Sequence, residues 1–351
     1  MTILLALLTV MLAAVTLLGR LPIHDWWARV CEFPRLQIVC LALPVALLGA
    51  FLTPPPGQWL IPLICSLVII KQVARILPWT ALWPVQMQTA DTGQADRKIT
   101  IMVANVLTSN HNSDALIEQV HAQQPDILLT LESDAWWQAQ LDEALGDWPH
   151  SVCVPQDNLY GMHLYSRLAL EETQVSFLIQ DDIPSIHTWI RLPCGECIYL
   201  HALHPRPPAP NESEESLWRD AELLLIGKKI HQGDYPAIVA GDLNDVAWSR
   251  TSRLFRRISG MLDPRRGRGM FNSFHAHYWF LRWPLDHVFT TEHFTLSRMH
   301  RLKDFGSDHF PIIATLCYRP SRATEHDAPS ANPDERQHAT EQVQEGKRRE
   351  Q

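Results

Sequence analysis

The sequence predicts an α/β domain made of two packed sheets flanked by helices, preceded by transmembrane helices at the amino terminus. Short strand-like apolar runs recur between residues 99 and 319, with helical patterns and hairpin spacings between them, a pattern typical of layered sheets. Before residue 79 there are three apolar runs, of which the first has the length of a membrane-spanning helix. At 351 residues, with 46% hydrophobic content, the chain is too long for one small domain.

Residues 1–78 are expected to form a membrane region with two or three transmembrane helices. The apolar runs cover residues 2–19, 38–52 and 59–70; the third is short and contains Pro62, so a buried core helix is an alternative for it. Residues 54–58, PPPGQ, cannot continue a helix, so we expect the second and third runs to form a hairpin. The first run lacks the basic flank and cleavage motif of a signal peptide. Tryptophans near the expected span ends suggest an aromatic belt: Trp26, Trp27, Trp59, Trp79 and Trp83.

Basic residues predict the orientation of this region. Arg20, Arg29 and Arg35 lie between the first two runs, Lys71 and Arg75 follow the third, and the Pro-rich loop carries no charge. With three spans, both basic regions lie on one side, and the positive-inside rule makes that side cytoplasmic. We therefore expect a multi-pass protein of the cell (inner) membrane with its large domain in the cytoplasm. With two spans the orientation would be reversed.

The rest of the chain divides into a linker, a domain and a tail. Residues 79–98, with Gln, Thr, Asp and Gly, are expected to be a linker, and residues 99–319 a catalytic domain. Strands are predicted at 99–106, 127–131, 161–167, 185–192, 197–203, 237–240 and 312–318, and helices at 115–124, 136–145 and 213–231. Residues 320–351 have no apolar period and are expected to be disordered.

The stretch from Ile238 to Asp245, IVAGDLND, is an apolar strand that ends in polar groups. Alternate side chains of an extended segment share a face, so Asp242 and Asn244 point the same way. A carboxylate beside a carboxamide can hold a water or a cation and can donate to a phosphate oxygen. A simple strand-to-loop turn is the alternative, because Gly, Asp and Asn all favour turns.

Three further strand ends carry similar groups. Asn105 lies in ITIMVANV, Glu132 follows PDILLTL, and GSDHFP at 306–311 precedes the strand IIATLCY. In this order, the motifs across about residues 98–319 resemble the endonuclease/exonuclease/phosphatase superfamily, which has the DNase I-like fold, in a bacterial membrane-anchored type. The resemblance implies a four-layer α-β-β-α sandwich with the active site at one end of the sheets.

The resemblance also implies a Mg²⁺ or Mn²⁺ site. Glu132 is the expected principal ligand, with Asn105 and Asp308 beside it. Oxygen and amide ligands without clustered thiolates favour these ions over zinc. Glu132 could instead be a surface carboxylate that begins a helix, but its position directly after LLTL argues against that.

Catalytic roles are expected for five residues, namely His204, Asp242, Asn244, Asp286 and His309. In the resembling enzymes an Asp of the preceding strand pairs with the last His, and such a pair fixes the imidazole tautomer and raises its basicity. Whether His309 or Asp242 accepts the proton from water stays open. By the same resemblance, His204 contacts the scissile phosphate or donates to the leaving oxygen, with His201 as the competitor, and Asn244 stabilises the phosphoryl group.

Two other motifs receive weaker interpretations. Seven arginines lie between residues 250 and 268, and Arg265, Arg266 and Arg268 are candidate phosphate contacts, with a solvated basic helix face as the alternative. Ser273-Phe274 stands where many members of the superfamily carry a Thr-Trp pair, which leaves the aromatic substrate contact open. Zinc at Cys194 and Cys197 is disfavoured because no second CxxC exists.

Together these features predict a membrane-anchored, metal-dependent hydrolase of phosphate esters. A nuclease is the favoured subclass, and a phospholipid or phosphoinositide phosphodiesterase or phosphatase is the alternative. An inactive membrane scaffold is the alternative of another class, but a scaffold has no need for both Asp286 and His309. The net charge of −8 does not exclude a phosphate-bearing substrate, because local charge and a bound cation decide that. The lipid bilayer is the expected partner of the apolar helices, and no protein partner follows from the sequence.

Overall fold

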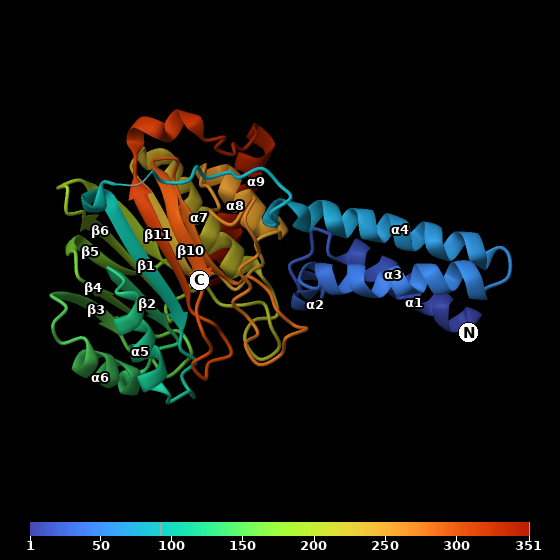
Figure 1. Cartoon of the computed structure of the whole chain (residues 1–351), viewed down its shortest axis with the longest axis horizontal. Helices are drawn as coiled ribbons and strands as arrows, with labels where there is room; N and C mark the ends of the chain where they lie inside the picture. Colours follow the sequence, from blue (N-terminus) through green and yellow to red (C-terminus); the bar gives the residue numbers. More distant parts are fainter. Residues whose placement is uncertain (92, 351) are drawn as a thin grey trace.

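The computed structural model describes residues 1–91 and 93–350. It consists of a two-sheet domain and a bundle of apolar helices that projects from one side of it (Figure 1). The predicted α/β class and the four-layer sandwich are both confirmed.

The first sheet has the strand order β10-β11-β1-β2-β4-β3. Its strands are β1 (Lys98–Asn105), β2 (Ile127–Leu131), β3 (His150–Val154), β4 (Met162–Ser166), β10 (Phe294–Arg301) and β11 (Ile312–Tyr318). Only β1 and β2 pair in parallel, so their carboxyl ends meet at the same edge of the sheet.

The second sheet has the order β5-β6-β7-β8-β9. Its strands are β5 (Ala169–Phe177), β6 (Pro184–Arg191), β7 (Cys197–Ala202), β8 (Ala237–Asp242) and β9 (Asp286–Thr290). Here β7 and β8 are the parallel pair. On β8 and β9, which are antiparallel, Asp242 lies directly opposite Asp286.

Side chains from both sheets form one apolar core between them, with members such as Val103, Leu129 and Ile238 fully buried. Burying each such side chain contributes about 1.5–3 kcal/mol. The helices α5 (Ser113–Gln123) and α6 (Ala135–Ala144) cover the outer face of the first sheet. The helices α7 (Leu217–Gly233) and α8 (Arg250–Ser259) cover the second. This layering fixes the polar strand ends at one end of the sandwich.

Strands β3, β5 and β10 were not predicted. They lie at the edges of the two sheets; β10 exposes polar residues, and β5 exposes a run of three polar residues, 172–174, beside Val175 and Phe177. An edge strand buries only part of its surface, so its sequence lacks the apolar run that marks a central strand.

The amino-terminal bundle consists of α1 (Thr2–Leu18), α3 (Arg35–Leu52) and α4 (Gly57–Ile76) (Figure 1). The predicted hairpin between the second and third runs is confirmed, since α3 and α4 pack together across the Pro-rich loop. By length and composition, α3 and the segment Gly57–Trp79 are long and apolar enough to cross a membrane, properties that they share with core helices and signal sequences. The third helix is longer than predicted, because Lys71, Gln72 and Arg75 continue it beyond the apolar run.

A short segment joins α1 to α3 and lies against the domain. It contains α2 (Trp26–Arg29) and the 3₁₀ turn η1 (Val30–Glu32). We call residues 24–33 the linking segment.

The expected linker is more ordered than its composition predicted. Trp79, expected in an aromatic belt, is buried in η2 (Leu77–Trp79) and donates to Asp263. Met87 is buried in the core between the sheets, and the backbone of Gln88 and Ala90 bonds to that of Leu296 on β10. A further turn, η3 (Ala95–Arg97), precedes β1.

The expectation of a disordered tail is wrong. After η4 (Pro320–Glu325), the chain forms α9 (Pro333–Glu350), which packs on α7 and α8. Ala339 and Val343 are buried against Leu224 and Leu254. Two isolated apolar positions on a charged helix produce too weak a period to be recognised without the surface that they cover.

Candidate active site

Polar residues from five strand ends meet at one end of the sandwich. They are Asn105 at the end of β1, Glu132 after β2, Asp242 at the end of β8, Asp286 at the start of β9, and His309 before β11. Each lies at or next to the end of a strand that is buried along all or most of its length, so the core fixes the backbone from which the side chain projects.

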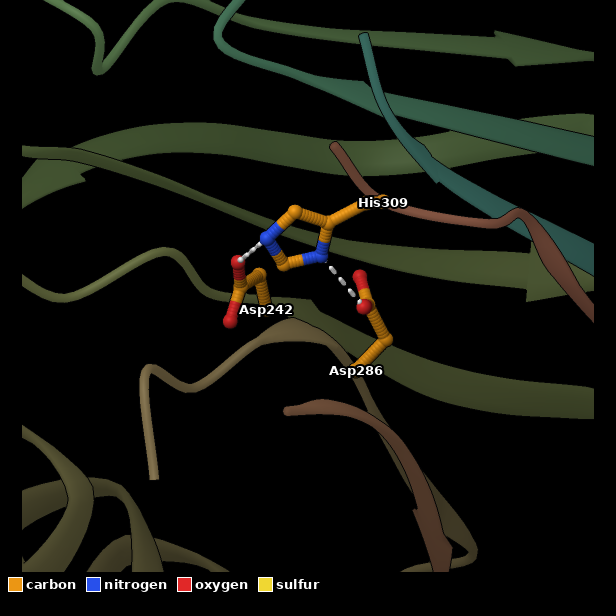
Figure 2. Close-up of side chains that lie close together, drawn as sticks. All are labelled: Asp242, Asp286 and His309. Atoms are coloured by element: carbon orange, nitrogen blue, oxygen red, sulfur yellow. Dashed lines mark hydrogen bonds and ion pairs between the residues drawn. The ribbon is translucent and has the colours of Figure 1, made fainter. Parts of the chain in front are cut away.

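His309 lies between two carboxylates (Figure 2). Its Nδ1 is 2.8 Å from Asp286 Oδ2, a hydrogen bond, and its Nε2 is 3.5 Å from Asp242 Oδ2. The loop before it is held by Ser307, whose Oγ donates to the Asn105 carbonyl at 2.8 Å and accepts from the His309 backbone N–H at 3.0 Å. The imidazole is thereby held at fixed positions relative to β1, β8 and β9.

The charges of this group are strongly coupled. Burial alone would lower the pKa of His309, but the carboxylates of Asp286 and Asp242 raise it to about 10. Burial raises the pKa of Asp242, and the imidazole of His309 opposes that rise. A cation bound nearby would lower the pKa of each of these groups, because positive charge favours the carboxylates and disfavours the imidazolium.

Asn105 connects the two sheets within the site. Its Nδ2 donates to Glu132 Oε1 at 2.7 Å and to Asp242 Oδ2 at 3.2 Å. Burial raises the pKa of Glu132 to about 7, although the hydrogen bond from Asn105 works against this. One amide group therefore holds the buried carboxylate of Asp242 and the partly buried carboxylate of Glu132 close together.

The backbone is strained at two of these positions. Glu132 has φ of 57° and Asn244 has φ of 50°, in the left-handed region that residues with a Cβ seldom adopt. Gly241 supplies the exit from β8, because a Cβ at that position would lie 1.9 Å from the Leu203 carbonyl oxygen. Local strain of this kind is concentrated at functional sites, where the surrounding packing maintains it.

The remaining predicted residues surround this centre. His204 is buried beside Tyr160, and burial lowers the pKa of its imidazole to about 4, with the Asp242 carboxylate opposing. Asn244 donates through Nδ2 to the Pro205 carbonyl at 3.0 Å. The competitor His201 lies elsewhere, bonded to His187 at 2.9 Å.

Arg265, Arg266 and Arg268, which were expected to contact substrate phosphate, do not line the pocket that Glu132 and His309 line. Arg265 is fully buried and donates to Asp263, to the Asp286 carbonyl and to His287, so it supports the backbone of the site instead. Arg266 lies over the ring of Trp79, and Arg268 donates to the carbonyl of Met87 in the linker segment. Arg265 contacts the site only through the backbone of Asp286, and Arg266 and Arg268 contact residues outside it, which their spacing in the sequence could not indicate.

The model of the endonuclease/exonuclease/phosphatase family matches residues 102–309, more than half of the chain. The chain belongs to this family. It is thus a phosphoester-hydrolysing enzyme. No curated protein matches it.

Solved structures with the family fold resemble it over the domain. An endonuclease/exonuclease/phosphatase from Beutenbergia cavernae DSM 12333 has 19% identity and a TM-score of 0.51, covering 64% of this chain and 72% of that chain. D. rerio TDP2, complexed with single strand DNA product, has 17% identity and a TM-score of 0.52, covering 62% and 98%. The human Nocturnin catalytic domain with bound sulfate anion has 16% identity and a TM-score of 0.53, covering 63% of this chain and 95% of that chain. At these identities the likeness establishes the fold and leaves the substrate open.

The residues of this family member fit a divalent cation. Glu132, Asp308 and His309 line one pocket, and Asp308 Oδ1 is buried without a hydrogen-bond partner among the described residues. The tightest cluster of ligand atoms in the described ranges is instead Asp242, Asp286 and His309. These three residues lie close together because both carboxylates contact the imidazole of His309. We therefore consider Glu132, Asn105 and Asp308 the better ligand set for a hard cation.

The pocket beside this centre has a volume of about 370 Å³ and a wall that the sequence did not indicate. Four of its residues belong to the linking segment, before the family domain begins, and others belong to the Pro-rich turn after β7 and to the chain before β9. The lining residues outside the centre are Trp26, Arg29, Val30, Phe33, Pro207, Pro208, Ala209, Pro210, Asn244, Phe274, Trp283 and Leu285. No motif marks Trp26 or Arg29 as part of the site, because their sequence context is that of a membrane loop.

Ser273 and Phe274 both contribute to the site. Ser273 Oγ accepts from the backbone N–H groups of Leu285 and Asp286 at 3.3 and 3.1 Å. The ring of Phe274 lies 4.9 Å from that of His309. Cys194 and Cys197 are both free thiols.

Proposed function

We propose that this family member is a membrane-anchored hydrolase of phosphate esters that depends on Mg²⁺ or Mn²⁺. The observation that carries the proposal is the convergence of Glu132, Asp242 and the Asp286–His309 pair at one centre, beside a pocket that Glu132 and His309 line. Hydrolysis of a phosphate ester requires neutralisation of the phosphoryl oxygens, activation of a water molecule and stabilisation of the leaving oxygen. The site contains groups suited to each of these tasks.

Each side chain has a role that follows from its position. A divalent cation held by Glu132, Asn105 and Asp308 would neutralise charge on the phosphoryl group. Asp242 Oδ2 and His309 Nε2 lie 3.5 Å apart, so one attacking water molecule can contact both, and one of the two groups accepts its proton. Asp286 fixes the His309 tautomer through Nδ1.

The other two residues act on the phosphoryl group. His204 is neutral near pH 7, because burial lowers the pKa of its imidazole to about 4. It can therefore donate a hydrogen bond to the leaving oxygen without adding a charge to the site. Asn244, in the pocket wall, stabilises the phosphoryl oxygens.

Membrane anchoring is supported by the surface of the bundle. Only 33% of the apolar window in α3 and 28% of that in α4 is buried, so most of these apolar side chains face outward. Arg20, Arg35, Lys71 and Arg75 line one hollow at the domain end of the bundle. Under the positive-inside rule this arrangement supports a cytoplasmic domain. Resistance of the protein to extraction by alkaline carbonate tests the anchoring.

Nucleic acid and lipid headgroups are both substrates of the required chemistry. Arg268 and Arg265, two of the candidate phosphate contacts, are bonded to the linker and to the domain core. If the protein were instead an inactive scaffold, it would hydrolyse no phosphate ester.

The test uses the full-length protein in detergent micelles with bis-p-nitrophenyl phosphate and p-nitrophenyl phosphate. We expect hydrolysis with Mg²⁺ or Mn²⁺, none with EDTA, and a loss of about 10²–10⁴-fold in His309→Ala and Asp242→Asn. His231→Ala, at an exposed histidine on α7, is the matched control and should retain full activity. Hydrolysis that survives EDTA, or equal rates in His309→Ala and His231→Ala, would exclude the mechanism.

A further inference from the structure

The linking segment and the catalytic domain form one packed unit. Arg29 is buried and its Nη2 lies 3.3 Å from Asp220 Oδ2, while its Nε donates to Ser216 Oγ at 3.1 Å. Glu32 accepts from Trp248 Nε1 at 2.9 Å through its carbonyl and from the Arg250 backbone N–H at 3.1 Å through its carboxylate. Charges buried in this way are costly to separate, so the bundle is held at a fixed position relative to the pocket.

The same segment forms one wall of the catalytic pocket. Trp26, Val30 and Phe33 line it together with Glu132 and His309. The linking segment joins the domain ends of α1 and α3, so this wall stands where the apolar helices meet the domain. If the bundle lies in a bilayer, the pocket lies at the bilayer surface.

A second wall of the pocket leads to an exposed aromatic loop. Phe274 and Trp283 pair through their backbones and their rings stack, 6.2 Å between centroids, where both line the pocket. The chain between them, residues 275–282, is anchored to the catalytic loop by a hydrogen bond of 2.6 Å from the Ala276 N–H to the Asp308 carbonyl. We call residues 274–283 the aromatic hairpin.

The tip of the aromatic hairpin faces away from the domain. Tyr278, Trp279 and Phe280 are exposed, Trp279 by 79%. The Phe280 carbonyl accepts a hydrogen bond of 2.8 Å from Gln37 Nε2, in the first turn of α3. The loop between α8 and β9 accordingly lies on the side of the domain from which the bundle projects (Figure 1).

This position explains the exposed aromatics. Large aromatic side chains are unfavourable in water and are favoured at the boundary between headgroups and acyl chains. The first turn of α3 is at that boundary if α3 spans the membrane. The basic hollow of Arg20, Arg35, Lys71 and Arg75 lies at the same end of the bundle and attracts anionic headgroups.

We propose that the pocket acts on a phosphate ester of a membrane lipid, whose phosphate reaches His309 while its acyl chains stay in the bilayer. This inference rests on the proposed function and specifies its substrate class. One water molecule is consumed: its oxygen ends on phosphorus, one P–O ester bond breaks, and the departing oxygen leaves as an alcohol, so no co-substrate is needed. A nucleic acid would have to enter along a membrane surface whose anionic lipids repel its phosphates.

The test places the full-length protein in phosphatidylcholine vesicles that contain phosphatidylglycerol, phosphatidic acid or a phosphatidylinositol phosphate. Hydrolysis is followed by ³¹P NMR. The comparison substrates are the deacylated counterpart of each lipid, single-stranded and duplex DNA, and soluble bis-p-nitrophenyl phosphate. We expect at least one lipid to be hydrolysed more than about tenfold faster than its deacylated counterpart, because confinement to the membrane raises its effective concentration.

A variant pair separates membrane docking from chemistry. Trp279→Ser/Phe280→Ser is expected to reduce lipid hydrolysis by about tenfold, since interfacial binding scales with buried apolar area, and to leave hydrolysis of the soluble ester unchanged. Phe177→Ser, at an aromatic position on β5 that is 47% exposed, is the matched control and should change neither.

The outcomes distinguish the two proposals. Turnover of the soluble ester without preference for any lipid, or DNA cleavage faster than lipid hydrolysis, overturns the lipid assignment and leaves the phosphoesterase standing. Absence of turnover on every ester overturns the phosphoesterase and the lipid assignment together. Equal lipid hydrolysis in the double variant and in Phe177→Ser refutes the role of the aromatic hairpin.

Discussion

Replacing Arg219 with Met tests whether buried ion pairs hold the linking segment and the catalytic loop together. Arg219 is 1% exposed, and its Nε and Nη2 donate to Asp220 Oδ1 at 3.1 and 2.9 Å. Its Nη1 donates to the Asn244 carbonyl at 2.7 Å. Because Arg29 binds the other oxygen of Asp220, one network connects the membrane side of the pocket to the loop after β8.

The expected effect follows from the charges left behind. Met preserves most of the apolar stem of Arg219 but leaves Asp220 and Asp245, both buried, with less positive charge nearby. Removing one partner of a buried pair costs about 3–5 kcal/mol. We therefore expect the free energy of unfolding to fall by about 4 kcal/mol. We also expect kcat to fall by about 10²-fold, because a shift of about 1 Å in the loop of Asn244 misplaces the reacting groups.

The loss of stability should depend on pH. Burial alone would raise the pKa of Asp220, but Arg219 and Arg29 hold it well below its ordinary value of 3.8. The unfolded chain therefore binds a proton at higher pH than the folded protein does. The stabilisation is complete above about pH 4 and declines as the pH falls below that value.

The assay is urea unfolding of the full-length protein in detergent, followed by tryptophan fluorescence. The control is Arg191→Met, which removes an arginine of similar geometry: Arg191 Nε and Nη2 donate to Glu171 at 2.6 and 3.0 Å, but the pair is exposed. Surface pairs contribute little, so this variant should unfold like the parent protein. A similar unfolding midpoint in both variants would refute the role assigned to the buried network.

Three further outcomes are expected. Burial raises the pKa of Glu222 from 4.5 to about 8, so the folded protein keeps a proton that the unfolded chain loses. Stability therefore falls as the pH rises from about 4.5 to about 8. Glu222→Gln should flatten the plot of melting temperature against pH, and an unchanged slope would contradict this. Asp286→Asn should lower kcat by about 10²–10⁴-fold in steady-state assays by releasing the His309 tautomer, whereas an unchanged kcat would show that His309 needs no partner. Glu132→Gln should raise the Mg²⁺ concentration for half-maximal activity by at least about tenfold, because a charged ligand is lost. A Mg²⁺ titration curve equal to that of the parent protein would show that Glu132 is not a metal ligand.

Local sequence patterns predicted the central strands and the polar groups at their ends. Strand β2 has the predicted bounds, Ile127–Leu131, and Glu132 follows it directly. A strand buried on both faces requires an unbroken apolar run, and the first polar residue after it marks where the chain leaves the core. Edge strands such as β5 lack that run, so they were missed.

The sequence by itself determined which residues end the buried strands, and with them the family and the groups that meet around His309. Only the tertiary structure decided how the rest of the chain surrounds them: that Arg265 supports β9 from within the core, that α9 covers α7, and that Trp26 and Arg29 form part of the pocket. The physical reason is the distance along the chain. Arg29 and Asp220 are 191 positions apart, and a contact of that kind leaves no periodicity in either segment, because it depends on how whole layers pack against each other.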